Sequence, residues 1–296
     1  MARQQDDEVP RTRDSAAPAP LRAAHPDEAG GVTMRAGEAL RAAEGWPLTS
    51  VPDTLAAAGD TGGFLSLAPH PDDESIGCGG LIAGCVAQGR SVKVVVLTDG
   101  AASHPGSPAF PPERLVALRQ AETRAAVAEL GLDPVRDLAF LGQPDAALPA
   151  RGPGLEAVVA AILRASEAGP PPVALLTTWG HDPHTDHKAA RAIGAAVARA
   201  LPSRPRFWAY PVWGLAFAHP IPGFPTPPEP DLSEPLRGVR FATDRYLSEK
   251  RRAVMAHRSQ TSDLIADDPA GFRLPAEALA LAFRPFELFL EENPDA

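Results

Sequence analysis

The 296-residue sequence lacks the features that mark several classes of protein. It has no run of about 18 apolar residues and no basic amphipathic helix, so we expect it neither to span a membrane nor to bind a membrane surface. A formal net charge of −9 argues against a general nucleic-acid binder, which needs a clustered basic surface. The first residues lead into no apolar segment of the kind that directs secretion. We therefore expect a cytoplasmic protein with neither a membrane nor a nucleic acid as partner.

Cysteine is also scarce, with two residues in the whole chain. Cys78 and Cys85 fall in one predicted helix, where two turns separate them by about 10 Å. That distance is too long for a disulfide, so cysteine usage fits a reducing compartment. The composition leaves the oligomeric state open, and a homo-oligomer is one of the states that it allows.

The two ends of the chain differ in pattern. Residues 1–35 are rich in Asp, Glu, Arg, Ala and Pro and have little periodicity, so we predict a mobile N-terminal tail. Residues 36–296 are expected to form a single domain with a sizeable core. Residues 214–240 are rich in proline and glycine, and no regular element is predicted there.

From Phe64 onwards, predicted strands alternate with predicted helices. The strands are expected over 64–68, 92–98, 138–141, 173–178, 206–213 and 285–290, and the helices over 76–88, 113–130, 154–168, 187–201 and 245–257. Strand, helix and strand with short joins form a unit of parallel strands with a right-handed crossover. The predicted fold class is therefore α/β, a Rossmann-like, doubly wound and mostly parallel sheet with helices on both faces.

Polar side chains gather directly after three of these strands. They are His70, Asp72, Asp73 and Glu74 after the first strand, Asp99 and His104 after the second, and His181, Asp182, His184, Asp186 and His187 after the fourth. In doubly wound sheets, ligands bind beyond the carboxyl ends of the strands. We therefore expect these loops to converge on one site.

The types of residue in these loops favour a metal ion. A catalytic zinc keeps three ligands from His, Asp or Glu and leaves one position for water. The first loop can supply His70 and a carboxylate. His184 and His187 lie on one side of the first turn of a helix, so one can bind metal while the other faces substrate. No Ser–His pairing or active cysteine is indicated, so hydrolysis by a metal-activated water is the favoured chemistry.

Several motifs resemble those of the PIG-L/LmbE family of zinc-dependent de-N-acetylases. The first motif of that family usually reads AHPDDE, and the chain has it with one additional proline, Pro69, before the histidine. The other matches are His184-Thr-Asp-His187, the TDG that ends Val95–Gly100, Arg119 with Glu122, and the HRSQ of His257–Gln260. The resemblance covers roughly residues 60–290 and implies an LmbE-like fold.

The resemblance implies a metal centre and a base. His70, Asp73 and His187 would hold Zn²⁺, although such a ligand set also accepts Fe²⁺ or another divalent ion. Asp72 would act as the general base on the attacking water. Because Asp72 and Asp73 are adjacent, only one need point to the metal, and which one does so comes from the resemblance alone. A helix N-cap is the alternative role for Asp72.

Three further residues receive roles from the resemblance. His184, as an imidazolium, would stabilise the oxyanion and protonate the leaving amine, and Asp186 would orient or charge a histidine. Arg119 would reach a substrate hydroxyl or phosphate, but its spacing from Glu122 also suits a pair that braces its own helix.

The implied activity is removal of an N-acetyl or other acyl group from a small N-acylated amino sugar, such as an N-acetylglucosamine derivative, or from a sugar conjugate. An amidase for a larger thiol- or sugar-linked conjugate is one alternative. A module that binds metal or sugar without turnover is another. Trp208, Tyr210 and Trp213 could stack on a sugar ring, but we interpret the alternation at 208, 210 and 212 as a half-buried strand.

Overall fold

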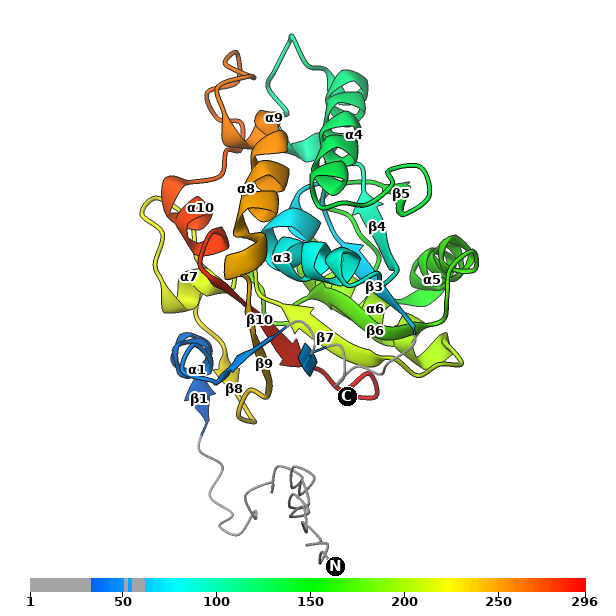
Figure 1. Cartoon of the computed structure of the whole chain (residues 1–296). Coiled ribbons are helices and arrows are strands. Elements are labelled where there is room, and N and C mark those ends of the chain that lie inside the picture. Colours follow the sequence, from blue (N-terminus) through cyan, green and yellow to red (C-terminus); the bar gives the residue numbers. More distant parts are fainter. Residues whose placement is uncertain (1–32, 51–52, 55–61) are drawn as a thin grey trace, which may run out of the picture. The chain divides into compact units, whose positions relative to one another are not determined.

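The computed structural model describes residues 33–50, 53–54 and 62–296 (Figure 1). The residues from Val32 to Ala296 form one compact unit. Most of the predicted N-terminal tail, residues 1–32, lies outside the described residues. Met34–Arg35, at the end of that predicted tail, form the short strand β1, which pairs with β8 (Asp231–Leu232).

An eight-stranded sheet with the order β2-β9-β10-β7-β6-β3-β4-β5 forms the centre of the fold. Its strands are β2 (Leu48–Thr49), β3 (Gly63–Ala68), β4 (Val92–Thr98), β5 (Leu138–Gln143), β6 (Pro172–Thr178), β7 (Arg206–Tyr210), β9 (Gly238–Ala242) and β10 (Phe286–Glu291). The strands from β3 to β7 pair in parallel, and β10 runs antiparallel to both β7 and β9. The predicted α/β fold with a mostly parallel sheet is confirmed.

Helices cover both faces of the sheet (Figure 1). They are α1 (Ala36–Ala43), α3 (Asp73–Ala87), α4 (Pro112–Glu129), α5 (Gly152–Ser166), α6 (Thr185–Ala200), α7 (Leu215–Ala218), α8 (Leu247–Ala256), α9 (Arg258–Thr261) and α10 (Ala276–Ala282), with single 3₁₀ turns at η1 (Ala101–Ser103) and η2 (Asp244–Tyr246). Successive strand residues point to opposite faces. Phe64 and Ala68 of β3 therefore join the core under α3, α4 and α8, whereas Leu65 and Leu67 join the core under α5 and α6.

The strand order creates a switch point at β3. The chain proceeds from β3 outward to β4 and β5, and then returns to β6 on the other side of β3. The loops that leave β3 and β6 therefore separate towards opposite faces of the sheet and leave a crevice between them, as is general for doubly wound sheets. The loop after β3 carries the first motif, with His70 and Asp73. The loop after β6 leads into His184-Thr-Asp-His187, here called the second motif.

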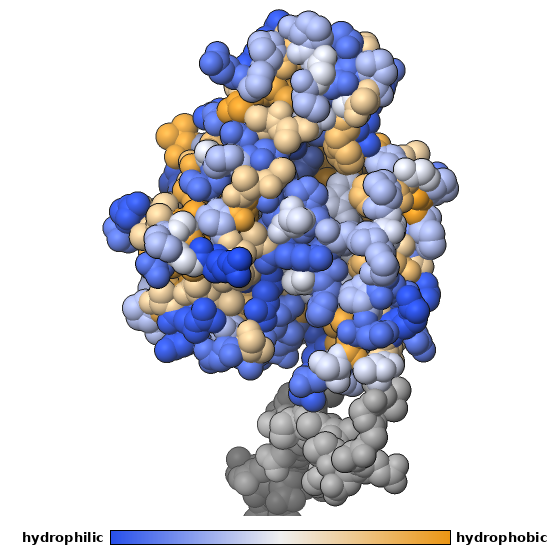
Figure 2. Space-filling model, turned by 180° about the vertical axis from the view of Figure 1, so that it is seen from behind, coloured by the Kyte–Doolittle hydropathy of each residue, from blue (hydrophilic) through white to orange (hydrophobic). Residues whose placement is uncertain are grey.

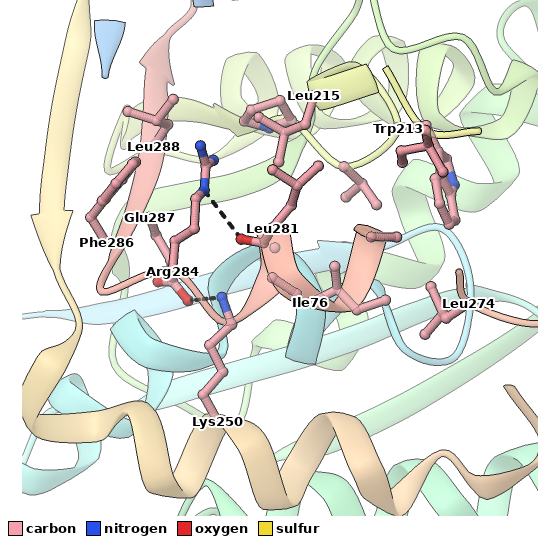
Figure 3. A pocket seen from close by; sticks show the side chains of 16 residues that line it. Ile76, Trp213, Leu215, Lys250, Leu274, Leu281, Arg284, Phe286, Glu287 and Leu288 are labelled. Carbon is pink, nitrogen blue, oxygen red and sulfur yellow. Dashed lines mark hydrogen bonds and ion pairs between the residues drawn. The ribbon is translucent and has the colours of Figure 1, made fainter. Parts of the chain in front are cut away.

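Helix α3 is built in two pieces. Cys78 has non-helical dihedral angles (φ −139°, ψ 17°), and the break leaves the backbone N–H groups of the next turn without helical partners. Glu287 of β10 accepts hydrogen bonds from Gly80 N (2.7 Å) and Leu81 N (2.9 Å). Lys250 Nζ pairs with the same carboxylate at 2.7 Å (Figure 3). This buried pair fixes the helix that begins at Asp73.

The structure departs from the sequence prediction at β2, α9 and α10, which were not predicted, and in two further regions. The predicted strand 206–213 ends at Tyr210, because Pro211 has no N–H to donate to the sheet. The interpretation of Trp208 and Tyr210 as half-buried is wrong, since β7 is covered on both faces and exposes 1% and 0% of these residues. Residues 214–240, for which no element was predicted, contain α7, β8 and the start of β9.

Large apolar side chains are mostly inside. Among the described residues, the exposed large apolar side chains are Leu48, Val135 and Met255. The face shown in Figure 2 carries apolar side chains interspersed with polar ones. Within the described ranges, we find no helix with both the length and the apolar character that crossing a membrane requires.

Candidate metal centre and active site

The turn after β3 places three polar side chains at the edge of the sheet. Thr98 of β4 donates both its N–H (2.9 Å) and its hydroxyl (2.8 Å) to the carbonyl of Pro69, which holds the turn against the neighbouring strand. Asp72 has φ 139° and ψ −26°, a conformation that is strained for a residue with a side chain. Its carboxylate makes no N-cap hydrogen bond, so the structure gives the alternative capping role no support. The strained turn instead directs the carboxylate into the cleft.

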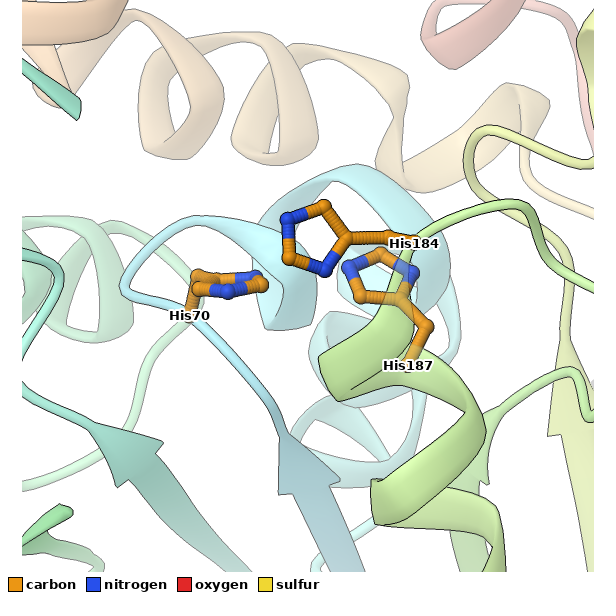
Figure 4. A group of neighbouring side chains, drawn as sticks. All are labelled: His70, His184 and His187. Carbon is orange, nitrogen blue, oxygen red and sulfur yellow. The ribbon is translucent and has the colours of Figure 1, made fainter. Parts of the chain in front are cut away.

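Asp73 joins the two motifs. Its Oδ2 atom lies 3.2 Å from His70 Nδ1 and 3.2 Å from His187 Nε2, and all three side chains are buried or nearly so. Figure 4 shows His70 on the turn after β3, facing His184 and His187 at the start of α6. The ring centroids of His70 and His184 are 4.5 Å apart. The structure therefore brings together the residues of the predicted ligand set.

The other nitrogen of each of these two histidines faces carboxylates. His187 Nδ1 lies 3.2 Å from Asp182 Oδ1, and His70 Nε2 lies 3.2 Å from both Asp145 Oδ1 and Asp186 Oδ2. Histidines that bind metal ions usually direct their second nitrogen to a carboxylate or carbonyl, which fixes the tautomer and raises the basicity of the ligand. Both histidines of the candidate centre have that arrangement.

Two of the ligand separations in the predicted donor set fit a tetrahedral metal ion. Neither ring nitrogen of the fully buried His187 has a hydrogen-bond partner of good geometry, which is costly unless another ligand satisfies it. Ligand atoms of tetrahedral zinc with bonds of about 2.0 Å lie about 3.3 Å apart. The separations of 3.2 Å from Asp73 Oδ2 to His70 Nδ1 and to His187 Nε2 agree with that spacing. These residues can therefore hold a divalent metal ion.

Among the described residues, two sets of three have ligand atoms that all lie within 4.8 Å of one another: His70 with His184 and His187, and His70 with Asp145 and Asp186. Both fit a metal less well. His184 Nδ1 already accepts a hydrogen bond from Asp186 N (3.2 Å). Asp186 accepts from Ala146 N and Leu148 N. These side chains make hydrogen bonds within the protein, whereas the nitrogens of His187 face carboxylates without a hydrogen bond of good geometry.

Charge is concentrated around these ligands. Burial alone would raise the pKa of the Asp73 carboxyl, but His187 and His70 hold it well below its usual range. Burial likewise disfavours a charged His187, yet Asp73 and Asp182 raise its pKa to about 9. The buried Asp73 carboxylate is therefore balanced by positive charge on the two histidines, and a metal ion held by these residues would supply the same charge.

Asp72 has the properties of a general base. Burial raises its pKa to about 6, although the Arg119 guanidinium opposes this shift. Arg119 Nη2 lies 3.3 Å from Asp72 Oδ2 and donates to the carbonyl of Pro71 (2.7 Å), while Nη1 donates to the carbonyl of Gly100 (3.0 Å). A base is most effective when its pKa lies near the working pH. Arg119 lines the cleft, and its guanidinium is held by these protein oxygens.

His184 caps the N-terminus of α6 through its ring. Because Nδ1 accepts the N–H of Asp186, the ring proton resides on Nε2. Burial, together with the positive charges of His70 and His187, lowers the pKa of His184 to about 4. The arrangement favours a neutral imidazole with one N–H, in place of the imidazolium that the resemblance implies.

The remaining motif residues support this arrangement. Glu74 accepts from Asp72 N (3.1 Å) and lies 3.1 Å from His257 Nε2. Glu122 accepts from both the N–H (2.7 Å) and the hydroxyl (2.6 Å) of Ser259. The helix with Arg119 and the HRSQ segment are therefore joined directly behind Asp72.

Sequence reasoning missed Asp145, and it placed Asp182 in the converging loops without assigning it a role. Asp182 is fully buried and accepts from Val212 N and Gly214 N in addition to facing His187. Asp145 follows β5, so the rule that ligands bind beyond strand ends was a usable signal for it. His104 is buried against Gly271 and does not line the cleft.

A cleft of about 340 Å³ opens beside the cluster. Its polar lining residues are His70, Asp72, Asp73, Ser103, Arg119, Asp145, His184 and Gln260. Clefts that hold small molecules measure roughly 300–1,000 Å³, so this one suits a compact ligand.

Comparison with known proteins agrees with the motifs. The model of the PIG-L family, described as GlcNAc-PI de-N-acetylase, matches residues 65–198. A curated relative, the probable N-acetyl-alpha-D-glucosaminyl L-malate deacetylase 2 of Bacillus anthracis, is 30% identical over 205 residues, which are 69% of this chain and 83% of the relative.

Solved structures share the fold. The conserved protein TT1542 from Thermus thermophilus is 25% identical with a TM-score of 0.54, over 79% of this chain and 96% of that protein. The N,N'-diacetylchitobiose deacetylase from Pyrococcus horikoshii has a TM-score of 0.58 at 19% identity, over 79% and 85% of the two chains, a likeness of fold alone.

Fold, motifs and matches together define an amide hydrolase of the deacetylase class. The chain belongs to the PIG-L family of de-N-acetylases, as its motifs predict.

Proposed function

We propose that the protein hydrolyses the N-acetyl group of an amino sugar or sugar conjugate at the cleft beside His70, Asp73 and His187. The observation that carries the proposal is the junction of the two motifs: one carboxylate, Asp73, contacts a histidine from each, with the carboxylate of Asp72 beside it in the same cleft. The Bacillus relative carries the name of a deacetylase of an N-acetylated sugar, which supports this class of substrate.

The proposed metal ligands are His70, Asp73 and His187, with zinc as the ion. A bound zinc ion lowers the pKa of a coordinated water to about 7 and polarises the amide carbonyl. Asp145 and Asp186 orient His70, and Asp182 orients His187, through the second ring nitrogens.

Asp72 is the proposed general base. It takes a proton from the attacking water as the oxygen forms its bond to the carbonyl carbon. The same proton can then pass to the amine nitrogen as the C–N bond breaks, which yields acetate and the free amine. The Arg119 guanidinium pairs with the Asp72 carboxylate and holds it in place. A contact of Arg119 with a substrate oxygen remains a prediction.

His184 is the proposed oxyanion donor. With Nδ1 occupied by Asp186 N, the Nε2–H is free to donate to the carbonyl oxygen as that oxygen gains negative charge. Asp186 therefore contributes twice, through its backbone to His184 and through its carboxylate to His70.

Acetate release tests the proposal. Protein loaded with zinc and protein treated with a chelator are incubated with N-acetylglucosamine and a panel of its conjugates, and free acetate and free amine are measured. We expect release by the loaded protein alone. If no member of a broad panel releases acetate or amine, the proposal is wrong.

A further inference from the structure

Three aromatic side chains line the same cleft as the proposed catalytic groups. They are Trp213, Phe224 and Phe272, here called the aromatic wall. The rings of Trp213 and Phe224 are stacked, with centroids 4.8 Å apart and planes 22° apart. Phe272 meets Trp213 edge to face at 5.5 Å. The wall is a continuous apolar surface within reach of the reacting groups.

The aromatic wall is held by the segments that build the metal centre. The turn of Trp213 is fixed by Asp182, whose Oδ2 accepts from Val212 N (3.1 Å) and Gly214 N (2.9 Å) and whose Oδ1 faces His187. Phe272 N donates to the carbonyl of Ser103 at 2.7 Å. The wall is therefore preorganised against the metal centre, and Phe224 and Phe272 remain partly exposed to the cleft.

A second hollow of about 480 Å³ continues from the first and shares His184, Trp213 and Phe224 with it. Its other lining residues are Pro183, Pro225, Thr226 and Pro227, which we call the proline groove. Apart from His184, no side chain of this hollow is ionisable, and Thr226 brings its one hydroxyl. The aromatic faces can stack on a sugar ring, but the prolines offer its hydroxyl groups no hydrogen-bond donor, whereas an apolar group gains from burial on the whole surface.

We propose that the aromatic wall and the proline groove form a subsite for an apolar group, an alkyl or aryl substituent several carbons long, carried by the substrate. The inference rests on the proposed deacetylase function and narrows it to conjugates with an apolar part. Such a group can be attached in two ways: on the acyl carbon of the amide, or as the aglycone on the sugar. In both cases an apolar chain or ring would occupy the proline groove beside His184.

Two substrate series test the subsite with zinc-loaded protein. The first is glucosamine N-acylated with acetyl, butyryl, hexanoyl or octanoyl groups. The second is N-acetylglucosamine as its methyl, butyl, hexyl or octyl glycoside. Burial of each methylene group is expected to raise kcat/KM by about two- to fourfold until the groove is filled. A rise in either series supports the subsite and identifies the attachment, and a flat or falling profile in both overturns it.

Matched variants localise the effect. For each substrate series, the ratio compared is kcat/KM of the longest member divided by kcat/KM of the shortest. Phe224→Ser is expected to lower this ratio by about tenfold. Phe272→Leu is expected to lower it by less, because leucine keeps an apolar side chain. Val135→Ser is the control, because Val135 is 91% exposed and lies outside the cleft. If Phe224→Ser and Val135→Ser leave the same ratio, the inference is wrong.

A binding measurement separates failure of the subsite from failure of the proposed function. Chelator-treated protein is titrated with octyl and methyl N-acetylglucosaminide, and tryptophan emission is recorded. Of the four tryptophans, Trp213 alone lines either hollow, so it is expected to dominate the change, which Trp213→Phe should remove. A change specific to the octyl compound supports the subsite even if no substrate is hydrolysed. Equal responses to the two compounds, or a response that survives in Trp213→Phe, contradict it.

Discussion

Replacement of Lys250 by Met is expected to destabilise the fold, because it leaves the Glu287 carboxylate buried without its counter-ion. Lys250 Nζ lies 2.7 Å from Glu287 Oε1, and each side chain is 2% exposed. Methionine keeps most of the aliphatic volume, so the change is mainly one of charge. The pair holds the break in α3, the helix that starts at Asp73, so the loss is expected to reach the active-site turn as well.

The magnitude follows from what remains around Glu287. Removing one partner of a buried ion pair costs about 3–5 kcal/mol. Glu287 keeps its hydrogen bonds from Gly80 N and Leu81 N, so we expect the lower end, about 3 kcal/mol of the free energy of unfolding. The double variant Lys250→Met/Glu287→Gln leaves no buried charge at this site. It is therefore expected to lose less free energy of unfolding than Lys250→Met alone.

Urea unfolding measures these differences as shifts of the midpoint, provided that the m value, the dependence of the free energy of unfolding on urea concentration, is the same in all variants. Lys188→Met is the matched control, because Lys188 is an exposed lysine on α6 and its loss should change the free energy of unfolding by no more than about 0.5 kcal/mol. Equal shifts of the unfolding midpoint in Lys250→Met and Lys188→Met would refute the reasoning.

Three further predictions concern the active site. Asp72→Asn should lower kcat for acetate release by about 10²–10⁴-fold, whereas the exposed Asp295→Asn should not, and similar rates in the two variants would remove Asp72 as the base. Asp182→Asn should weaken zinc affinity about 10–100-fold, measured by competition with a chromophoric chelator, because His187 loses its orienting carboxylate. An unchanged affinity would contradict that role. Chelation should abolish acetate release and zinc should restore it, and release that survives chelation would exclude a metal-dependent reaction.

The local pattern was enough to predict six of the eight strands and the edge of the sheet where the polar loops meet. The run of apolar and β-branched residues over 92–98 is the strand that the structure contains, because a buried central strand is apolar on both faces. His70 and Asp73 after β3, and His187 after β6, meet because parallel strands bring their carboxyl ends to one edge.

Other features depend on tertiary contacts that no local pattern reports. The residues next to Asp182 in the sequence do not indicate whether it is solvated or buried. It is buried because Val212 N, Gly214 N and His187, from other parts of the chain or the next helix, surround its carboxylate. The hydrogen bond from Asp186 N to His184 Nδ1 depends on the fold at the start of α6, and helix propensity does not predict it. The aromatic wall likewise forms only in the folded chain, because Phe272 comes from a different loop than Trp213 and Phe224.

The zinc content of two adjacent variants tests the central claim, which is that Asp73 binds the metal and Asp72 does not. Wild type, Asp72→Asn and Asp73→Asn are loaded with zinc, freed of excess metal and measured by elemental analysis. We predict about one zinc ion per chain in wild type and in Asp72→Asn, and a large loss in Asp73→Asn. Loss of zinc in Asp72→Asn with retention in Asp73→Asn would contradict the proposed division of roles between the two aspartates.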